Sequence, residues 1–293
     1  MMKKFENIVV GVDYSDASIQ ALKQAGRIAA AEGSELAALH VIIPSEIEQY
    51  GRYYTVSEET LLETFRKELA TLVARELGPD ITARSEAILG IPHHDLIDWA
   101  ERNSCDLLVL GTKGESAGPH DVGYFATKCV RNSPMPILLN RKRHSDRFTR
   151  VVACIDFSES TRGVLDAAAK IARDEDAELH VVHAVTPPWL LPSHVLYNTQ
   201  TAEDDAYKAQ YRELLEDEML AACSPIEPEP QRHIIEHENI NQALIQFLQQ
   251  HQSELAVLGR SGKTAKLIKQ FFLGTTAERL IHHSPCSVLV IPQ

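Results

Sequence analysis

Short apolar runs alternate along the chain with longer segments in which apolar residues recur every three to four positions. The first run, Ile8–Asp13, is continuously apolar up to its closing aspartate, as expected for a strand buried on both faces of a sheet. Ala17–Glu32 follows with apolar residues near helical spacing, and Glu58–Leu77 repeats that spacing before Gly78-Pro79. The pattern therefore predicts strands alternating with helices.

The rest of the first half continues this alternation. A helix is predicted from Pro92 through Ala100. The predicted strands are Ile8–Asp13, Leu36–Ile43, Ile81–Leu89, Leu107–Leu110 and Ile137–Leu139. Alternating strands and helices indicate a parallel sheet with right-handed crossovers, so the expected fold class is α/β.

The second half of the chain repeats the first. Four blocks match in the same order, the first two at an offset of 143 residues: 7–16 with 150–159, 35–41 with 178–184, 106–114 with 254–262, and 132–139 with 283–290. Such a repeat indicates a duplicated domain. We therefore expect two tandem Rossmann-like, doubly wound domains, residues 1–143 and 147–293, each with a five-stranded parallel sheet. The polar, basic segment 141–147 would link them.

Charge and composition narrow the classes of partner. The net charge of −12 argues against binding of nucleic acid or an anionic membrane by the bulk surface. The apolar runs have strand length only, so no membrane span is expected, and the amino end does not have the pattern of a signal peptide. The five cysteines are scattered and never form C-x-x-C. That usage favours reduced thiols and a cytoplasmic location.

A glycine-rich block, Leu255–Thr276, is the strongest candidate for binding chemistry. An apolar strand leads into Gly259, Arg260, Ser261 and Gly262, and Gly274, Thr275 and Thr276 open a predicted helix. Glycines let the backbone approach an anion, and the first N–H groups of a helix face it. Five Lys and Arg residues against one acid between positions 260 and 279 reverse the local sign of charge. An ordinary strand-to-helix turn with a solvated basic face is the alternative.

The predicted sheet brings other residues to the same edge. Ligands of open α/β sheets bind at the carboxyl ends of strands where the strand order reverses. In the second half this edge would hold Asp156 and Phe157, Ala184 and Val185, and the glycine block. Asp156 is placed to accept from a ribose hydroxyl or an adenine amino group. Its other interpretation is a helix cap.

Several resemblances to known sites fail on spacing. Gly262-Lys263-Thr264 looks like the end of a P-loop, but position 257 is a valine rather than the required glycine. His93-His94, His282-His283 and the pair His233/His237 do not have zinc-ligand spacing, so no metal site is expected. The sequence shows neither a Gly-x-Ser-x-Gly elbow nor His-Glu-x-x-His, and no catalytic residue is predicted.

With Asp156 and the Gly259–Gly274 block in place, nearly the whole chain resembles a tandem universal stress protein. The nucleotide-binding branch of that family carries glycine, two residues, glycine, nine residues, then glycine with Ser or Thr, and binds ATP. The resemblance implies that Asp156 holds the adenosine end and the backbone at Ala184 the adenine. It assigns the phosphates to Gly259, Arg260, Gly262, Gly274, Thr275 and Thr276.

The two halves depart differently from the family pattern. In the second half the spacer 263–273 has eleven residues rather than nine. The first half keeps Asp13, Gly111 and Gly114, but its spacer 115–122 has eight residues and Gly123 is followed by Tyr124. A tyrosine there would crowd a phosphate pocket. We expect the second half to be the nucleotide site and the first to be degenerate.

Three functions follow from these residues. The first is a cytoplasmic stress-response protein that holds ATP, with or without Mg²⁺, in the second half, with slow hydrolysis left open. The second is a non-enzymatic scaffold, or a binder of another small molecule, on the same fold. The third is a true ATPase or nucleotidyl-transfer enzyme, which the lack of an evident general base disfavours.

Two segments bear on assembly. The insertion 186–200, rich in proline and aromatic residues, is interpreted either as a lid beside a ligand or as a segment that packs on the other half, and the second is favoured. The last strands, Ile137–Leu139 and Val288–Ile291, are apolar edges of the kind that pair. We expect the halves to form a dimer-like unit within one chain, and homodimer formation is left open.

Overall fold

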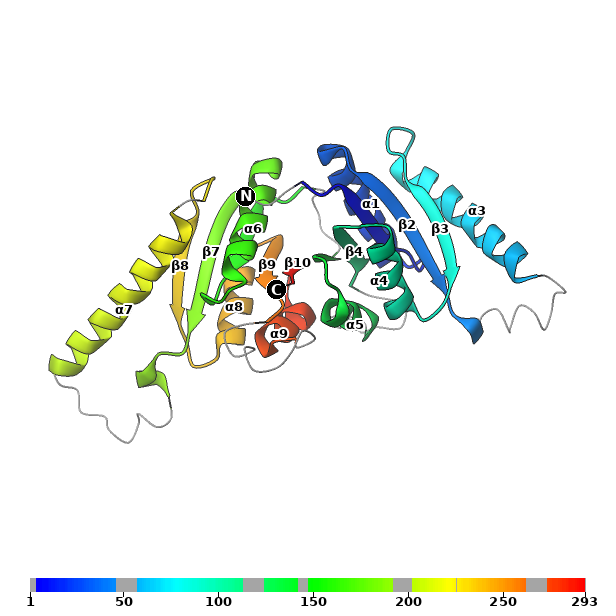
Figure 1. Ribbon diagram of the computed structural model, residues 1–293. Helices are drawn as coiled ribbons and strands as arrows, with labels where there is room; N and C mark the ends of the chain where they lie inside the picture. The colour runs from blue at the N-terminus through cyan, green and yellow to red at the C-terminus, as the bar shows by residue number, and fades with distance from the viewer. Residues whose placement is uncertain are drawn as a thin grey trace. The chain divides into compact units, whose positions relative to one another are not determined.

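The computed structural model describes residues 4–45, 57–112, 124–141, 147–191, 202–224, 226–261 and 273–292. The chain divides into two compact units, Lys3–Asp146 and Arg147–Ile291. Each unit is an α/β domain with five strands and helices on both faces of them (Figure 1). The predicted fold class is confirmed.

The five strands of the N-terminal domain lie in the order β3-β2-β1-β4-β5. Every adjacent pair among them is parallel. The strands are β1 (Asn7–Gly11), β2 (Glu35–Ile42), β3 (Arg84–Leu89), β4 (Leu107–Gly111) and β5 (Ile137–Asn140). The order reverses between β1 and β4, so the carboxyl ends of these two strands form the switch point of a doubly wound sheet.

Helices cover both faces of this sheet. Helices α1 and α3 pack against each other, as do α4 and α5, and α3 lies along β3 at the outer edge (Figure 1). Their bounds are α1 (Asp16–Glu32), α3 (Glu58–Leu77), α4 (Pro92–Arg102) and α5 (Tyr124–Asn132). Helix α3 has the predicted bounds, whereas α1 begins one residue before Ala17 and α4 continues two residues past Ala100. Ser15 and Ser57 cap α1 and α3, and Gly33 ends α1 in the left-handed region.

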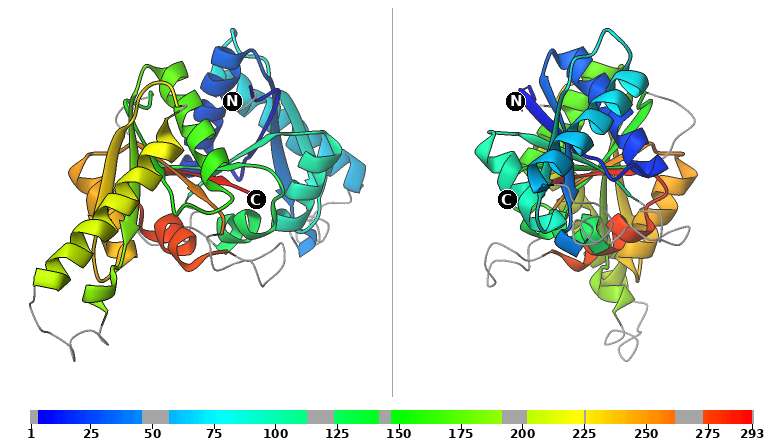
Figure 2. Two further views of the ribbon diagram at one scale, coloured as in Figure 1. Left: turned by 60° about the vertical axis from the view of Figure 1, so that its left-hand side comes forward. Right: turned by 90° about the vertical axis from the view of Figure 1, so that its right-hand side faces the viewer.

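The C-terminal domain repeats the arrangement in the order β8-β7-β6-β9-β10, again with parallel neighbours. Its strands are β6 (Arg150–Cys154), β7 (Glu178–Val185), β8 (Gln231–Glu236), β9 (Leu255–Gly259) and β10 (Ser287–Ile291). Its helices are α6 (Thr161–Glu175), the short 3₁₀ turn η1 (Pro188–Leu190), α7 (Ala202–Cys223), α8 (Ile240–Gln250) and α9 (Thr275–His283). Figure 2 shows the long helix α7 beside β8.

The central strands form the core of each domain. Val9, Val10, Val151, Val152 and Val257 have no exposed surface, which matches the continuously apolar runs in the sequence. Most strand boundaries differ from the prediction by one or two residues, and the third strand differs most. It begins at Arg84 rather than Ile81, because residues 79–80 form a turn and pairing with β2 starts only at Arg84.

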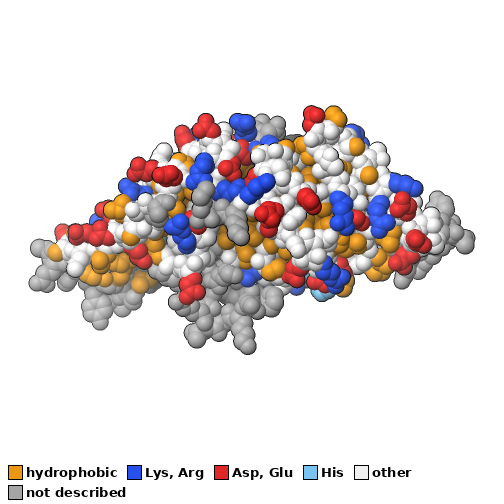
Figure 3. Space-filling model, turned by 45° about the horizontal axis from the view of Figure 1, so that its top comes forward, with side chains coloured by type: hydrophobic (Ala, Val, Ile, Leu, Met, Phe, Trp, Pro, Cys, Tyr) orange, Lys and Arg blue, Asp and Glu red, His pale blue; other side chains and the backbone are white. Residues whose placement is uncertain are grey.

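The surface carries charges of both signs. Acidic and basic side chains lie interspersed with apolar ones on the face drawn in Figure 3. Within the described residues, none of the helices has the length and apolar character that a membrane crossing needs.

Candidate functional site

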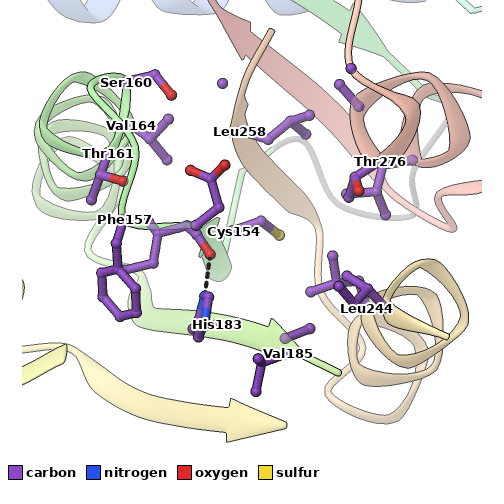
Figure 4. A pocket seen from close by; sticks show the side chains of 18 of the residues that line it. Cys154, Phe157, Ser160, Thr161, Val164, His183, Val185, Leu244, Leu258 and Thr276 are labelled. Carbon is purple, nitrogen blue, oxygen red and sulfur yellow. Dashed lines mark hydrogen bonds between the residues drawn. The ribbon is translucent and has the colours of Figure 1, made fainter. Parts of the chain in front are cut away.

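A cavity of about 410 Å³ lies in the C-terminal domain at the carboxyl ends of β6, β7 and β9. The amino-terminal ends of α6 and α9 and the first half of α8 also line it (Figure 4). Helix α7 adds Tyr211, Leu215 and Glu218. Its volume falls within the range of sites for small molecules. The doubly wound sheet therefore places a cavity at its switch point, where the sequence predicts a ligand.

The turn after β6 is stabilised by a hydrogen bond from its backbone to the Asp156 side chain and by a contact between two aromatic rings. Asp156 Oδ1 accepts a hydrogen bond from the N–H of Ser158 at 3.1 Å. Phe157 has a left-handed backbone with φ of 54°, and its ring lies 4.4 Å from that of His183. His183 is hydrogen bonded through Nδ1 to the carbonyl oxygen of Ile155 at 2.9 Å (Figure 4). This places both Asp156 and Phe157 on the cavity wall.

Gly259 brings the end of β9 close to the start of α6. A Cβ at Gly259 would lie 2.3 Å from the Oγ of Ser160, so this position requires glycine while Ser160 stays in place. The carbonyl oxygen of Arg260 accepts from the N–H of Gly274 at 2.9 Å. Arg260 and Gly274 therefore lie next to each other. Gly262 and spacer residues 263–272 lie outside the described residues.

Helix α9 presents its positive end to the cavity. Gly274 occupies the N-cap in an extended conformation and makes no side-chain cap, so it contributes no oxygen to the first-turn N–H groups. Thr275 and Thr276 line the cavity, as does Arg260, whose side chain is 7% exposed. Burial lowers the pKa of the Arg260 guanidinium, but arginine stays charged in proteins. The amino-terminal end of α9 and the guanidinium of Arg260 together favour an anion at this wall.

Eight predicted residues meet at this cavity. The structure brings together Asp156, Phe157, Ala184, Gly259, Arg260, Gly274, Thr275 and Thr276. Gly262 and its first-half counterpart Gly114 lie outside the described residues. The sequence analysis missed His183, Ser160, Thr161, Tyr211 and Glu218, which also line the cavity. The repeat could have indicated His183, because it lies 143 residues after His40, which is the offset between the two halves.

The polar lining suits binding. The hydroxyl oxygen of Thr161 is buried and has no hydrogen-bond partner within the described part of the chain. Burial, with a smaller contribution from Cys286, raises the pKa of the Cys154 thiol to about 12. Cys154 is therefore a neutral thiol near pH 7 and not a nucleophile.

The corresponding edge of the N-terminal domain is closed at its glycine. A Cβ on Gly111 would lie 2.6 Å from the backbone carbon of Ala17, so the first turn of α1 fills the space beside this strand end. Asp13 Oδ1 accepts from both the N–H and the hydroxyl of Ser15, at 3.1 and 2.5 Å. Tyr14 has φ of 64°, like Phe157, and the Nδ1 of His40 is hydrogen bonded to the carbonyl of Val12 at 2.7 Å.

The difference between the domains lies in where the first helix begins. Helix α1 begins at Asp16, whose counterpart in the repeat is residue 159 (16 + 143), whereas α6 begins at Thr161. The later start of α6 leaves a serine side chain beside Gly259, where α1 places backbone beside Gly111.

The start of the insertion 186–200 packs on its own domain. The indole of Trp189 lies edge-on to Tyr211 and Tyr207, with ring centroids 5.2 and 6.1 Å apart. Tyr211 also lines the cavity, so Trp189 supports the cavity wall formed by α7. Residues 192–200, on which the expected contact with the other half depends, lie outside the described part.

Comparison with known proteins assigns the chain to a family. The model described as the Universal stress protein family matches residues 4–141 and again residues 147–292. A universal stress protein of Mycobacterium tuberculosis is 26% identical over 246 residues, which are 78% of this chain and 82% of the relative. One from Methanocaldococcus jannaschii is 29% identical over 148 residues, 47% of this chain and 83% of the relative.

Solved structures agree on the fold. The crystal structure of a universal stress protein from Archaeoglobus fulgidus superposes with a TM-score of 0.68 at 20% identity and covers 98% of both chains. Another universal stress protein, solved in complex with cAMP, is 27% identical over 47% of this chain and 97% of its own, with a TM-score of 0.33. At that TM-score the likeness places no ligand here.

Proposed function

The chain belongs to the universal stress protein family, and we propose that its C-terminal domain binds an adenine nucleotide, ATP, as part of a stress response. The observation that carries the proposal is the cavity of about 410 Å³, where a carboxylate, a glycine strand end and a helix amino terminus meet. These are the three features that a nucleoside polyphosphate requires in a doubly wound fold.

Different parts of the cavity wall suit different parts of the ligand. Asp156 would accept from the ribose or the adenine amino group, and the Phe157 ring and the backbone at Ala184 would flank the base. The phosphates would lie against Gly259, Arg260 and the first turn of α9, where N–H groups and positive charge compensate an anion. The position of Mg²⁺ is not part of the proposal.

The N-terminal domain would not share this role. The first turn of α1 occupies the space beside Gly111, and Asp13 already accepts two hydrogen bonds from Ser15. Both observations support the expectation that the first site is degenerate. They also favour a second candidate role for this domain, as a scaffold without a nucleotide.

The proposal is tested by isothermal titration of the full chain with ATP, with and without Mg²⁺. Asp156→Ala should weaken binding at least about tenfold, since a hydrogen bond to a charged group contributes about 1.5–3 kcal/mol. Asp13→Ala is the matched control, because it removes the same carboxylate from the other copy, and it should leave the affinity unchanged.

Two results would contradict the proposal. One is the absence of measurable heat with ATP for the wild-type chain. The other is equal weakening by both substitutions, which would show that the C-terminal cavity is not the specific site. Native mass spectrometry of freshly purified protein distinguishes nucleotide binding from the scaffold alternative, because a scaffold should carry no co-purified adenine nucleotide.

A further inference from the structure

Three histidines from separate elements converge on one face of the C-terminal sheet. They are His180 on β7, His233 on β8 and His251 at the C-cap of α8. One ring nitrogen of each lies within 4.8 Å of the others. Nδ1 of His180 and Nε2 of His233 are only 3.0 Å apart. The sequence analysis paired His233 with His237, whereas the sheet places it beside His180 instead.

The strand register explains how this cluster forms. His233 lies opposite Val182 in the parallel pair β7–β8, and His180 is two residues before Val182. Side chains two residues apart point to the same face of a strand, so both imidazoles face α8. Helix α8 ends there, and the ring of its Phe247 stacks on His251 at 3.9 Å and meets His233 edge-on at 4.8 Å.

One outer ring nitrogen is hydrogen bonded as in a metal ligand, and another faces a carboxylate beyond hydrogen-bond distance. Nδ1 of His251 lies 3.0 Å from the carbonyl oxygen of Phe247, to which its N–H donates, and this leaves Nε2 with a lone pair. Nε2 of His180 faces Glu178 Oε2 at 3.6 Å, which leaves Nδ1 toward His233. Metal-binding histidines commonly donate their second N–H to a carbonyl or carboxylate in this way.

The other copy of the domain shows that the fold does not require these histidines. The equivalent positions hold Ala37, Glu86 and the α4 cap residue Asn103. There Arg84 bridges Glu86 and Asn103, with hydrogen bonds of 2.8 and 3.3 Å. A salt-bridge network in one copy is thus replaced in the other by three imidazoles around a shared point.

We propose that His180, His233 and His251 bind one divalent first-row transition-metal ion of the kind that imidazole ligands favour, such as Zn²⁺. Three imidazoles with a fourth position for water or a carboxylate form a known ligand set for zinc. In a tetrahedral site with Zn–N bonds of about 2.0–2.1 Å the ligand nitrogens are about 3.4 Å apart, so binding would need ring movements of up to about 1.5 Å. In the metal-free chain, one proton shared between His180 and His233 would take the ion's place.

The site is reachable and separate from the nucleotide cavity. His180 is 3% exposed, but His233 and His251 are only partly buried, and β8 is the outermost strand of its domain. The cavity involves the other ends of the same elements, at His183–Val185 of β7 and Ile240 of α8. Glu178 lies 3.6 Å from Nε2 of His180 and is also paired with Arg150 at 3.1 Å, so it supplies a negative charge beside the cluster.

The test uses the full-length chain after removal of metal with EDTA. Titration with Co²⁺, followed by the visible absorption of tetrahedral cobalt, and calorimetry with Zn²⁺ should each give one equivalent per chain. His233→Gln and His251→Gln should each weaken binding about 10–100-fold or more, because removal even of second-shell groups has that effect.

The matched control is His94→Gln. His94, Asp95 and Asp98 on α4 form the other group of metal-capable side chains in the described residues, and His94 is exposed. This substitution should not change the affinity. Loss of binding in His94→Gln, no bound equivalent in the wild type, or retained affinity in both His233→Gln and His251→Gln would overturn the proposal.

A measurement on the wild-type chain avoids dependence on how the variants fold. The chain has 13 histidines, and NMR of their ring nitrogens should show three coordinated on addition of one equivalent of Zn²⁺. Coordination at histidines other than these three, or none at all, contradicts the assignment.

Discussion

At the scale of single residues, glycine is required for different reasons in the two copies. A Cβ at Gly111 would meet the backbone of α1, at Ala17 and Ser18, whereas a Cβ at Gly259 would meet the side chain of Ser160. Backbone in the first turn of a helix cannot move without shifting that helix. At Gly259, rotation of the serine hydroxyl relieves the closest contact and leaves the Ser160 Cβ at 2.9 Å. The same motif therefore tolerates substitution differently in each domain.

We expect Gly111→Ala to destabilise the chain by about 1–3 kcal/mol, the usual cost of overpacking, and Gly259→Ala by less. Denaturant unfolding of the two variants beside the wild type measures this difference. If Gly259→Ala proves the more damaging, the close approach of α1 to β4 is not the stronger constraint.

At the scale of elements, the amino ends of two helices are satisfied differently. Helix α1 has Ser15 as its N-cap, with the Oγ accepting from the N–H of Ser18, and an aspartate in its first turn. Helix α9 begins on Gly274 without a side-chain cap. An uncapped helix end at a cavity wall favours a ligand anion, and a capped one is satisfied within the protein.

Gly274→Asp should therefore act in opposite directions on stability and on binding. An aspartate at the N-cap should raise stability by a few tenths of a kcal/mol, since its extended backbone accepts any residue. The same carboxylate should repel the phosphates and weaken ATP binding. Thermal melting without ligand and calorimetry with ATP give the two measurements, and unchanged affinity would show that α9 does not contact the phosphates.

At the scale of the whole molecule, two copies of one domain have kept the same strand order but not the same side-chain chemistry. The C-terminal copy has the cavity proposed for a nucleotide at the carboxyl ends of its strands and the histidine cluster at the opposite end. The N-terminal copy has α1 backbone and a salt-bridge network in those places. Ligands should therefore stabilise one domain more than the other.

Hydrogen exchange followed by mass spectrometry can resolve this asymmetry. At ATP concentrations about 100-fold above its dissociation constant, binding adds about 2.7 kcal/mol to the stability of the domain that binds it. We expect added protection in β6, β9 and α9, and little change in β1, β4 and α5. Equal protection of both domains would show that the N-terminal site also binds.

The expected dimer-like unit of the two halves belongs to this scale too. Two family matches in one chain agree with a two-domain arrangement. Direct contact between the halves, and any homodimer of whole chains, stay predictions.

The sequence by itself determined the duplication, the alternating elements and the chemistry at the switch point. Apolar runs such as Val9–Val10 and the end of α3 before Gly78-Pro79 depend on a few neighbouring residues, so the local pattern contains them. Eight of the predicted site residues meet at one cavity because parallel strands deliver their carboxyl ends to one edge.

Only the tertiary structure decided which side chains meet across elements. His180, His233 and His251 are far apart in sequence, and their convergence depends on strand register and on where α8 ends. The closure beside Gly111 likewise depends on a helix that begins two residues earlier in the repeat. Periodicity records which face of an element is buried, but it carries no information about what lies opposite that face.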